Sequence, residues 1–210
     1  MEQIITCGAD RYNPELLPKL EAHVEEQVQS QTYNLEANLC LLRLYQFYPE
    51  RGNARVLSQV LLKGLMQLPN PDCDLYLHLV PERVQQEEPF STILNLASML
   101  NGARFREFWQ AYGPAAEMLD SVPGFKEGVR SYIMHVVGST YQNVPSNVIE
   151  EVMGLASAEV PAFIASQPGL TVNGDLLQLP ANEDNHPVAK NSVESISFHQ
   201  IVPCLALGLS

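Results

Sequence analysis

Positive charge is scarce in this sequence, and the deficit narrows the range of functions. The 210 residues include 12 Lys and Arg against 24 Asp and Glu, which gives a formal net charge of −12 at pH 7. A chain with this balance repels phosphate backbones over the molecule as a whole, although a local basic patch could escape the average. We therefore expect no autonomous DNA or RNA binding.

Long apolar runs and an export leader are also missing. No stretch of about 18 apolar residues occurs, and residues 1–5 show no positive segment leading into an apolar one. We expect neither secretion nor membrane insertion. The cysteines form no Cys-x-x-Cys pair, which fits a reduced compartment, the cytoplasm, with a nuclear location left open. They are Cys7, Cys40, Cys73 and Cys204, and we expect Cys40 to be a buried core residue.

Motifs for nucleotide, zinc-hydrolase and serine-esterase chemistry are absent as well. The sequence has no Gly-x-x-x-x-Gly-Lys loop, no His-Glu-x-x-His helix and no Gly-x-Ser-x-Gly turn. His135 is the histidine most worth weighing as a base, but a base needs a nearby nucleophile or carboxylate, and a packed or surface role fits it better. We expect no catalytic residue, no cofactor and no bound metal.

What the sequence does contain is helical periodicity. Hydrophobic residues make up 46% and charged residues 17%, the composition of a folded globular chain. Within residues 14–30, Leu16, Leu20, Val24 and Val28 recur at every fourth position, so one apolar stripe faces inward. Asn13 supplies the N-terminal cap of this helix.

Further helices follow in pairs. Residues 34–48 form the partner of the first helix, with Asn34 as its cap. A second pair consists of residues 53–68 and a helix from 72 to about 86, in which Pro81 predicts either a kink or a break into 74–80 and 82–87. A helix around residues 93–100 precedes two shorter ones, 103–111 and 114–121. Three successive hairpins predict HEAT/TPR-like helical repeats over residues 1–122, although an irregular bundle would give much the same pattern.

The pattern changes after residue 122. Helices are predicted over 125–141, 146–153 and 158–167, followed by two short extended runs around Asn173-Gly174, a strong hairpin signal. Three helices and a β-hairpin predict a winged helix over residues 123–210. Residues 181–192 read as a loop, and an apolar segment that includes Phe198 and Ile201 predicts a final docking helix or strand. The fold class is thus mainly α, with helical repeats and a winged-helix domain.

This winged helix lacks the charges of a DNA-binding one. Residues 123–210 hold three Lys or Arg against eight Asp or Glu, a net charge of −5, and Glu159 is the one charged residue in the candidate recognition helix. The apolar content of that helix exceeds what one buried stripe uses, so we expect it to bind protein. The candidate partner-binding residues are Phe163, Ile164, Leu177, Leu179, Phe198 and Ile201.

Several segments, in collinear order, resemble the subunit K family of eukaryotic translation initiation factor 3. The likeness runs from residue 10 to about 165 and is weaker beyond that point. The segments are Asp10-Arg11-Tyr12-Asn13-Pro14-Glu15, Leu35-Glu36-Ala37-Asn38-Leu39, Leu44-Tyr45-Gln46-Phe47, the aromatic segment 105–110, Pro123-Gly124-Phe125 and His135-Val136-Val137-Gly138.

The resemblance implies a PCI-type architecture and a role. It implies a non-catalytic scaffold subunit, paired with subunit L, of the complex that binds the small ribosomal subunit and supports translation initiation. A small PCI-type subunit of the proteasome lid or the COP9 signalosome would share this architecture and stays open as an alternative. A winged-helix nucleic-acid binder and an enzyme are the remaining alternatives.

Overall fold

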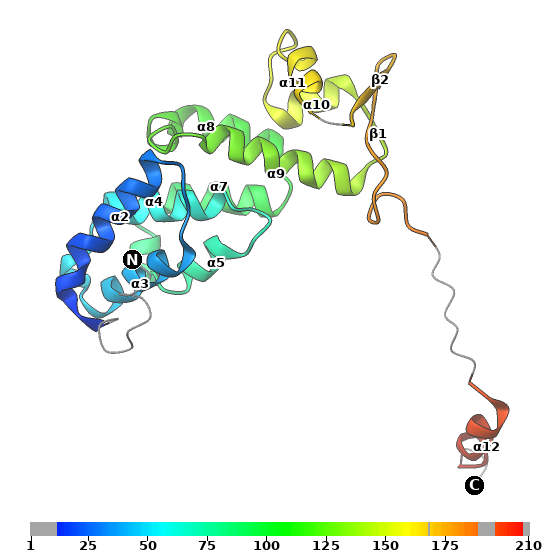
Figure 1. Cartoon of the computed structure of the whole chain (residues 1–210), viewed down its shortest axis with the longest axis horizontal. Helices are drawn as coiled ribbons and strands as arrows, with labels where there is room; N and C mark the ends of the chain where they lie inside the picture. The colour runs from blue at the N-terminus through cyan, green and yellow to red at the C-terminus, as the bar shows by residue number, and fades with distance from the viewer. Residues whose placement is uncertain (1–11, 168, 189–195, 208–210) are drawn as a thin grey trace.

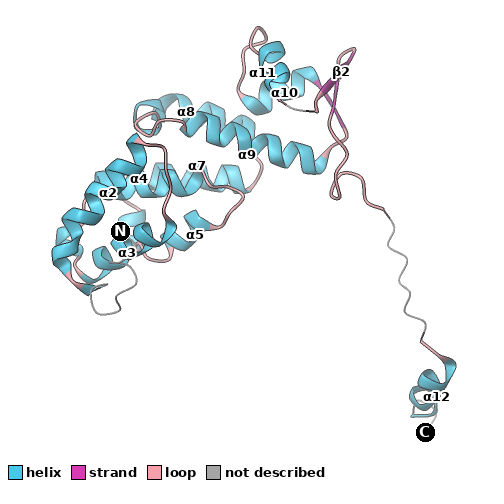
Figure 2. Cartoon of the chain, in the orientation of Figure 1, coloured by secondary structure: helices cyan, strands magenta, loops and turns pink. Residues whose placement is uncertain are grey.

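The computed structural model describes residues 12–167, 169–188 and 196–207. Figure 1 shows a body of packed helices that leads through one long helix into a smaller part with a sheet, and Figure 2 shows how little of the chain is strand. The fold is mainly helical with one small antiparallel sheet, which confirms the predicted fold class.

The first helical pair forms as its caps predict. The short 3-10 helix η2 (Pro14–Leu16) leads into α2 (Leu17–Gln29), and α3 (Leu35–Phe47) packs against α2. The backbone N–H of Glu15 donates to Asn13 Oδ1 at 3.0 Å, and that of Ala37 donates to Asn34 Oδ1 at 3.0 Å. Both side chains thus satisfy backbone groups that a helix start leaves without partners.

The second pair contains the central helix of the body. After η3 (Pro49–Arg51), α4 (Ala54–Leu65) is buried along its whole length from Val56 and contacts α2, α5, α7 and α9. It is followed by α5 (Asp72–Leu77) and α6 (Glu82–Gln85). Of the two alternatives predicted at Pro81, a kink or a break, the structure has the break, since Pro81 stands between these two helices.

The third pair corrects one expectation. It consists of α7 (Phe90–Asn101) and a continuous α8 (Phe105–Leu119), whereas the sequence predicted separate helices over 103–111 and 114–121. Pro114 lies inside α8 but faces solvent, and Gly113 before it has open space around it. Buried side chains on both sides of the proline, Tyr112 and Leu119 among them, hold the helix together and offset the lost hydrogen bond.

The remaining elements form a winged helix. They are α9 (Phe125–Thr140), β1 (Asn143–Pro145), α10 (Ser146–Met153), α11 (Val160–Ser166), β2 (Thr171–Asn173) and β3 (Leu176–Gln178). The sheet order is β1-β3-β2, all antiparallel, with Val144 and Val172 both opposite Leu177. The predicted hairpin turns at Gly174, whose φ of +64° suits glycine. Strand β1 was not predicted.

The end of the chain is helical. Helix α12 (Phe198–Leu207) decides between the predicted helix and strand, and Figure 1 draws it apart from the rest of the molecule. The loop expected over 181–192 is seen at 181–188, and its remainder lies outside the described residues.

The hydrophobic core is continuous from the repeats into the winged helix. The predicted boundary after residue 122 falls in the turn between α8 and α9. Val122, Phe125, Val129 and Ile133 are all buried there and belong to the same cluster as the repeat core. Helix α9 therefore contributes to both parts of the fold.

A network of polar side chains lies inside the repeats. The Tyr33 hydroxyl donates to Asp72 Oδ2 at 2.7 Å and lies 2.7 Å from the Tyr76 hydroxyl. Asn38 Nδ2 donates to the Tyr76 hydroxyl at 3.1 Å, and Gln27 Nε2 donates to Asn38 Oδ1 at 3.0 Å. Burial, reinforced by its hydrogen bonds, raises the pKa of Tyr33 far above its usual range, and burial raises the pKa of Tyr76 to about 12.

We expect the free energy of unfolding to fall as the pH rises above about 10, the ordinary tyrosine value. Because the folded-state pKa values are raised, the unfolded chain releases these protons first. The stabilisation is complete below about pH 10 and is lost progressively towards pH 12. Urea denaturation at about pH 8, 10 and 11 measures the loss. The Tyr33→Phe/Tyr76→Phe variant should show a shallower loss, and Tyr141→Phe, at an exposed position, should keep the wild-type slope; three equal slopes would contradict the role of the network.

Candidate docking surface

A joint between α8, α9 and α10 fixes the winged helix on the repeats. Trp109 Nε1 donates to the carbonyl of Val152 at 2.7 Å, and Arg130 donates through Nε to Met153 O at 3.1 Å and through Nη2 to Gly154 O at 3.0 Å. The Arg130 guanidinium also lies 5.6 Å from the centre of the Trp109 ring. Carbonyls at the end of α10, which have no partner within their helix, are thus satisfied from α8 and α9.

Aromatic packing and an ion pair extend this joint. The Tyr112 and Phe125 rings stack with centroids 6.5 Å apart, and Lys126 Nζ lies 5.3 Å from the centre of the Tyr112 ring. Arg106 of α8 forms an ion pair with Glu151 of α10. Arg130 and Arg106 are therefore engaged within the chain, and neither offers a free charge to a nucleic acid.

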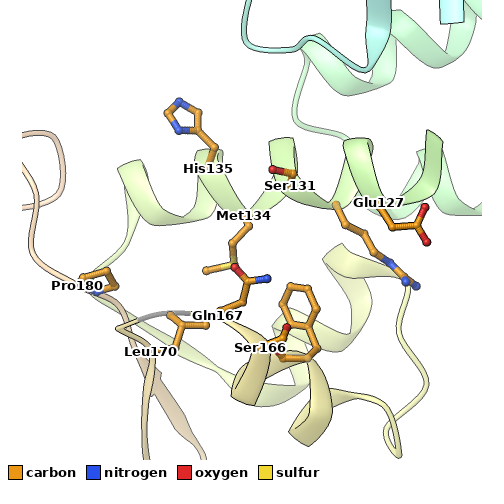
Figure 3. Close-up of a pocket in the computed structure, with 10 residues that line it drawn as sticks. Glu127, Ser131, Met134, His135, Ser166, Gln167, Leu170 and Pro180 are labelled. Carbon is orange, nitrogen blue, oxygen red and sulfur yellow. The ribbon is translucent and has the colours of Figure 1, made fainter. Parts of the chain in front are cut away.

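A groove lies beside the joint, between α9 and α11. Its volume is about 510 Å³, and Figure 3 shows Met134 pointing from α9 towards Gln167 and Leu170. Met134, Phe163, Leu170 and Pro180 give it an apolar lining. The polar side chains that complete the lining are Glu127, Arg130, Ser131, His135, Ser166 and Gln167.

The candidate partner-binding residues fall into three groups. Phe163 and Ile164 are half-buried on α11, and Phe163 lines the groove. Phe198 and Ile201 are 71% and 38% exposed on α12. Leu177 and Leu179 instead fill the core of the chain.

The burial of Leu177 and Leu179 has a simple cause. Side chains alternate between the two faces of a strand, and Leu177 opposes Val144 in a register that points it into the core. Leu176, its neighbour, is exposed, as is Val172 on β2. Leu177 and Leu179 offer no side-chain surface, and we leave them out of the docking surface proposed below. From the sequence, the alternation of side chains along this strand predicts that one of its two faces turns inward, but it does not identify that face.

The groove residues on α9 were not predicted as a surface. Met134 sits within an apolar run, Tyr132-Ile133-Met134, in which Ile133 is buried and Met134 is half-buried. No local pattern distinguishes these two positions without knowing where α11 packs. The groove could only be found once the helices were placed together.

Histidine and cysteine side chains and potential metal ligands are the groups that bear on catalysis. The His135 side chain is exposed and makes no hydrogen bond to the described residues, and Figure 3 shows its ring pointing away from Met134. Cys40 is buried, as predicted, and burial, followed by the nearby Asp74 charge, raises the pKa of the Cys73 thiol to about 12. Cys7 lies outside the described residues. Across residues 12–167, 169–188 and 196–207, no group of His, Cys, Asp and Glu could hold a metal ion.

The part of the chain that is described contains no helix long and apolar enough to cross a membrane. Helix α11, in the position of a recognition helix, has no charged residue in its sequence, Val-Pro-Ala-Phe-Ile-Ala-Ser. Exposed carboxylates lie beside it, Glu159 directly before the helix and Glu127 in the lining of the same groove. The surface of this winged helix therefore favours a protein over a phosphate backbone.

Helical repeats that share their core with a winged helix define the class of PCI-like scaffold proteins. The chain belongs to the CSN8/PSMD8/EIF3K family, whose sequence model matches residues 51–191.

Three relatives of this chain carry the same description. The Xenopus tropicalis and Homo sapiens proteins called "Eukaryotic translation initiation factor 3 subunit K" are each 37% identical to this chain, over 201 and 202 residues. Both alignments cover 95% of this chain and 91% of the relative. The Drosophila ananassae protein of the same description is 32% identical over 206 residues, which cover 98% of this chain and 92% of the relative. The resemblance found in the sequence is thereby confirmed.

We expect Gly154→Ala to destabilise the joint more than Gly174→Ala destabilises the wing. Both glycines have positive φ, +57° and +64°, so both variants lose about 1 kcal/mol to the left-handed conformation. A Cβ at Gly154 would lie 2.6 Å from Trp109 Cδ2, whereas a Cβ at Gly174 meets nothing within 4 Å. Overpacking should cost Gly154→Ala about 1–3 kcal/mol more.

Urea denaturation, followed by the fluorescence of Trp109, the single tryptophan, measures both variants. The native-state spectrum should shift in Gly154→Ala and not in Gly174→Ala. Equal losses of stability with unchanged spectra would show that Trp109 does not hold α10 in place.

Proposed function

We propose that this chain is a non-catalytic scaffold subunit of the eukaryotic translation initiation factor 3 complex. In this role it docks sister subunits in the cytoplasm and supports binding of the small ribosomal subunit during initiation. The observation that carries the proposal is the match to relatives described as subunit K, which extends over nearly the full length of both chains. The alternative, a subunit of the proteasome lid or the COP9 signalosome, has the family but not these relatives in its favour.

A docking role agrees with the chemistry of the described surface. His135 has no hydrogen-bonded nucleophile or carboxylate beside it, and the Cys73 thiol is buried in its neutral form. General-base or thiolate catalysis needs the opposite arrangement. The exposed groups that stand out are apolar instead, on α12 and on the wing.

We assign the contact with sister subunits, subunit L first among them, to α11 and α12. Phe163 and Ile164 present part of their surface on α11, and Phe198 and Ile201 are exposed on α12. Large apolar side chains in the centre of an interface supply most of the binding free energy. Burial of Phe198 against a partner would add to this binding free energy in proportion to the apolar area removed from water.

Affinity capture of the tagged full-length chain from a cytosolic extract, with ribosomes removed by salt, tests this proposal. The wild-type chain should recover initiation factor 3 subunits in stoichiometric amounts. Phe198→Asp/Ile201→Asp should reduce that recovery at least about tenfold, because two buried carboxylates cost several kcal/mol at an apolar interface. Val188→Asp, which places one such carboxylate on an exposed residue outside α12, is the control and should recover the complex normally.

Other outcomes change the conclusion. Lid or signalosome subunits in place of initiation factor subunits would keep the scaffold role and assign a different complex. Normal recovery by the α12 variant would remove Phe198 and Ile201 from the interface. A wild-type chain that captures no stoichiometric partner would overturn the proposal.

A further inference from the structure

Helix α12 is too short and too irregular to persist by itself in water. It has ten residues, with Pro203 in its interior. Isolated helices shorter than about 12 to 15 residues are only marginally stable in water. A proline in the helix interior costs about 3 kcal/mol relative to alanine. Its exposed side chains Phe198, Ile201 and Val202 follow the i, i+3, i+4 spacing of one stripe. The helix therefore needs an apolar surface against which to fold.

The groove between α9 and α11 has the dimensions for it. The lining residues on α9 run from Glu127 to His135, about 12 Å along the helix axis, and α12 is about 15 Å long. Met134, Phe163 and Leu170 supply apolar side chains along the groove, whose volume of about 510 Å³ admits several large side chains.

The chain leaves the winged helix beside this groove. Asn185 is buried, and its Nδ2 donates to Gly138 O at 2.9 Å and to Pro180 O at 3.0 Å. Gly138 lies less than one turn of α9 beyond His135, and Pro180 itself lines the groove. Phe198 follows Asn185 by thirteen positions, a reach of at most about 45 Å. A tether of this length gives the helix an effective concentration on the order of millimolar at the groove.

Charge also suits this occupant. The sequence of α12, Phe-His-Gln-Ile-Val-Pro-Cys-Leu-Ala-Leu, has no Asp, Glu, Lys or Arg. Arg130, the cation at the groove, is committed to the carbonyls of Met153 and Gly154. A neutral helix can enter without burying an unpaired charge, which would cost several kcal/mol.

We propose that α12 of the free chain folds back into its own α9–α11 groove. Phe198, Ile201 and Val202 pack against Met134, Phe163 and Leu170. The free subunit thereby covers the apolar residues that we assign to partner contacts, and a partner exchanges with α12 on assembly. The contact within the free chain does not depend on which complex the protein joins.

Hydrogen exchange of the full-length monomer tests the contact, with two matched variants on α11. Ser166→Arg places a bulky charge at the rim of the groove, at the last residue of α11, where a cation is favourable. Ala165→Arg places the same side chain on the neighbouring exposed residue, which does not line the groove. We expect the α12 amides to be protected in the wild type and in Ala165→Arg, and to exchange at least about tenfold faster in Ser166→Arg.

A reciprocal variant keeps the test independent of changes at the groove. Phe198→Asp/Ile201→Asp should speed exchange of the α11 amides by a similar factor. Unprotected α12 amides in the wild type, or equal exchange in the two arginine variants, would overturn the proposal. Protection that rises with protein concentration would overturn it in favour of a second copy as the occupant. Since capture of sister subunits is a separate measurement, either proposal can fail without the other.

Discussion

The contact between Trp109 and Gly154 is the constraint on which the rest of the arrangement depends. A helix end leaves carbonyls without partners, and here Trp109 and Arg130 supply the donors from α8 and α9. The indole ring can approach this closely only because residue 154 has no Cβ. Helix α10 is thereby fixed on the repeats, and with it the winged helix and the groove between α9 and α11.

Helix caps and helix breaks predicted most of the fold because each acts only on the residues next to it in the sequence. The Asn13 and Asn34 caps and the break at Pro81 each depend on one or two residues, and each is present in the structure. The continuous α8 was missed because Pro114 is a strong local stop signal that distant packing overrides. Strand β1 was missed for the same reason, since its three residues are a strand only by pairing with β3.

The candidate site was harder to predict because it depends on which face turns inward. The leucine-rich segment 176–179 predicts a strand, and the structure buries Leu177 while exposing Leu176. The nearly unbroken apolar sequence of α11 likewise identified the helix, but not its groove with α9, in which Met134 lies 29 positions before Phe163 in the sequence. The amino-acid composition of α11 predicted a protein-binding surface, but the surface could be located only from the packing of the helices.

A weak contact between α12 and the groove of its own chain is compatible with tight assembly of the subunit into a complex. A helix held by its own chain pays little entropy to dock, so a few apolar contacts suffice in the free subunit. A partner must supply more buried area than the groove does, since it has to compensate both for losing that contact and for associating. Interfaces between permanent subunits commonly exceed 2,000 Å² in total, far more than one ten-residue helix can bury. The groove can therefore cover α12 before assembly without preventing its transfer to a larger surface.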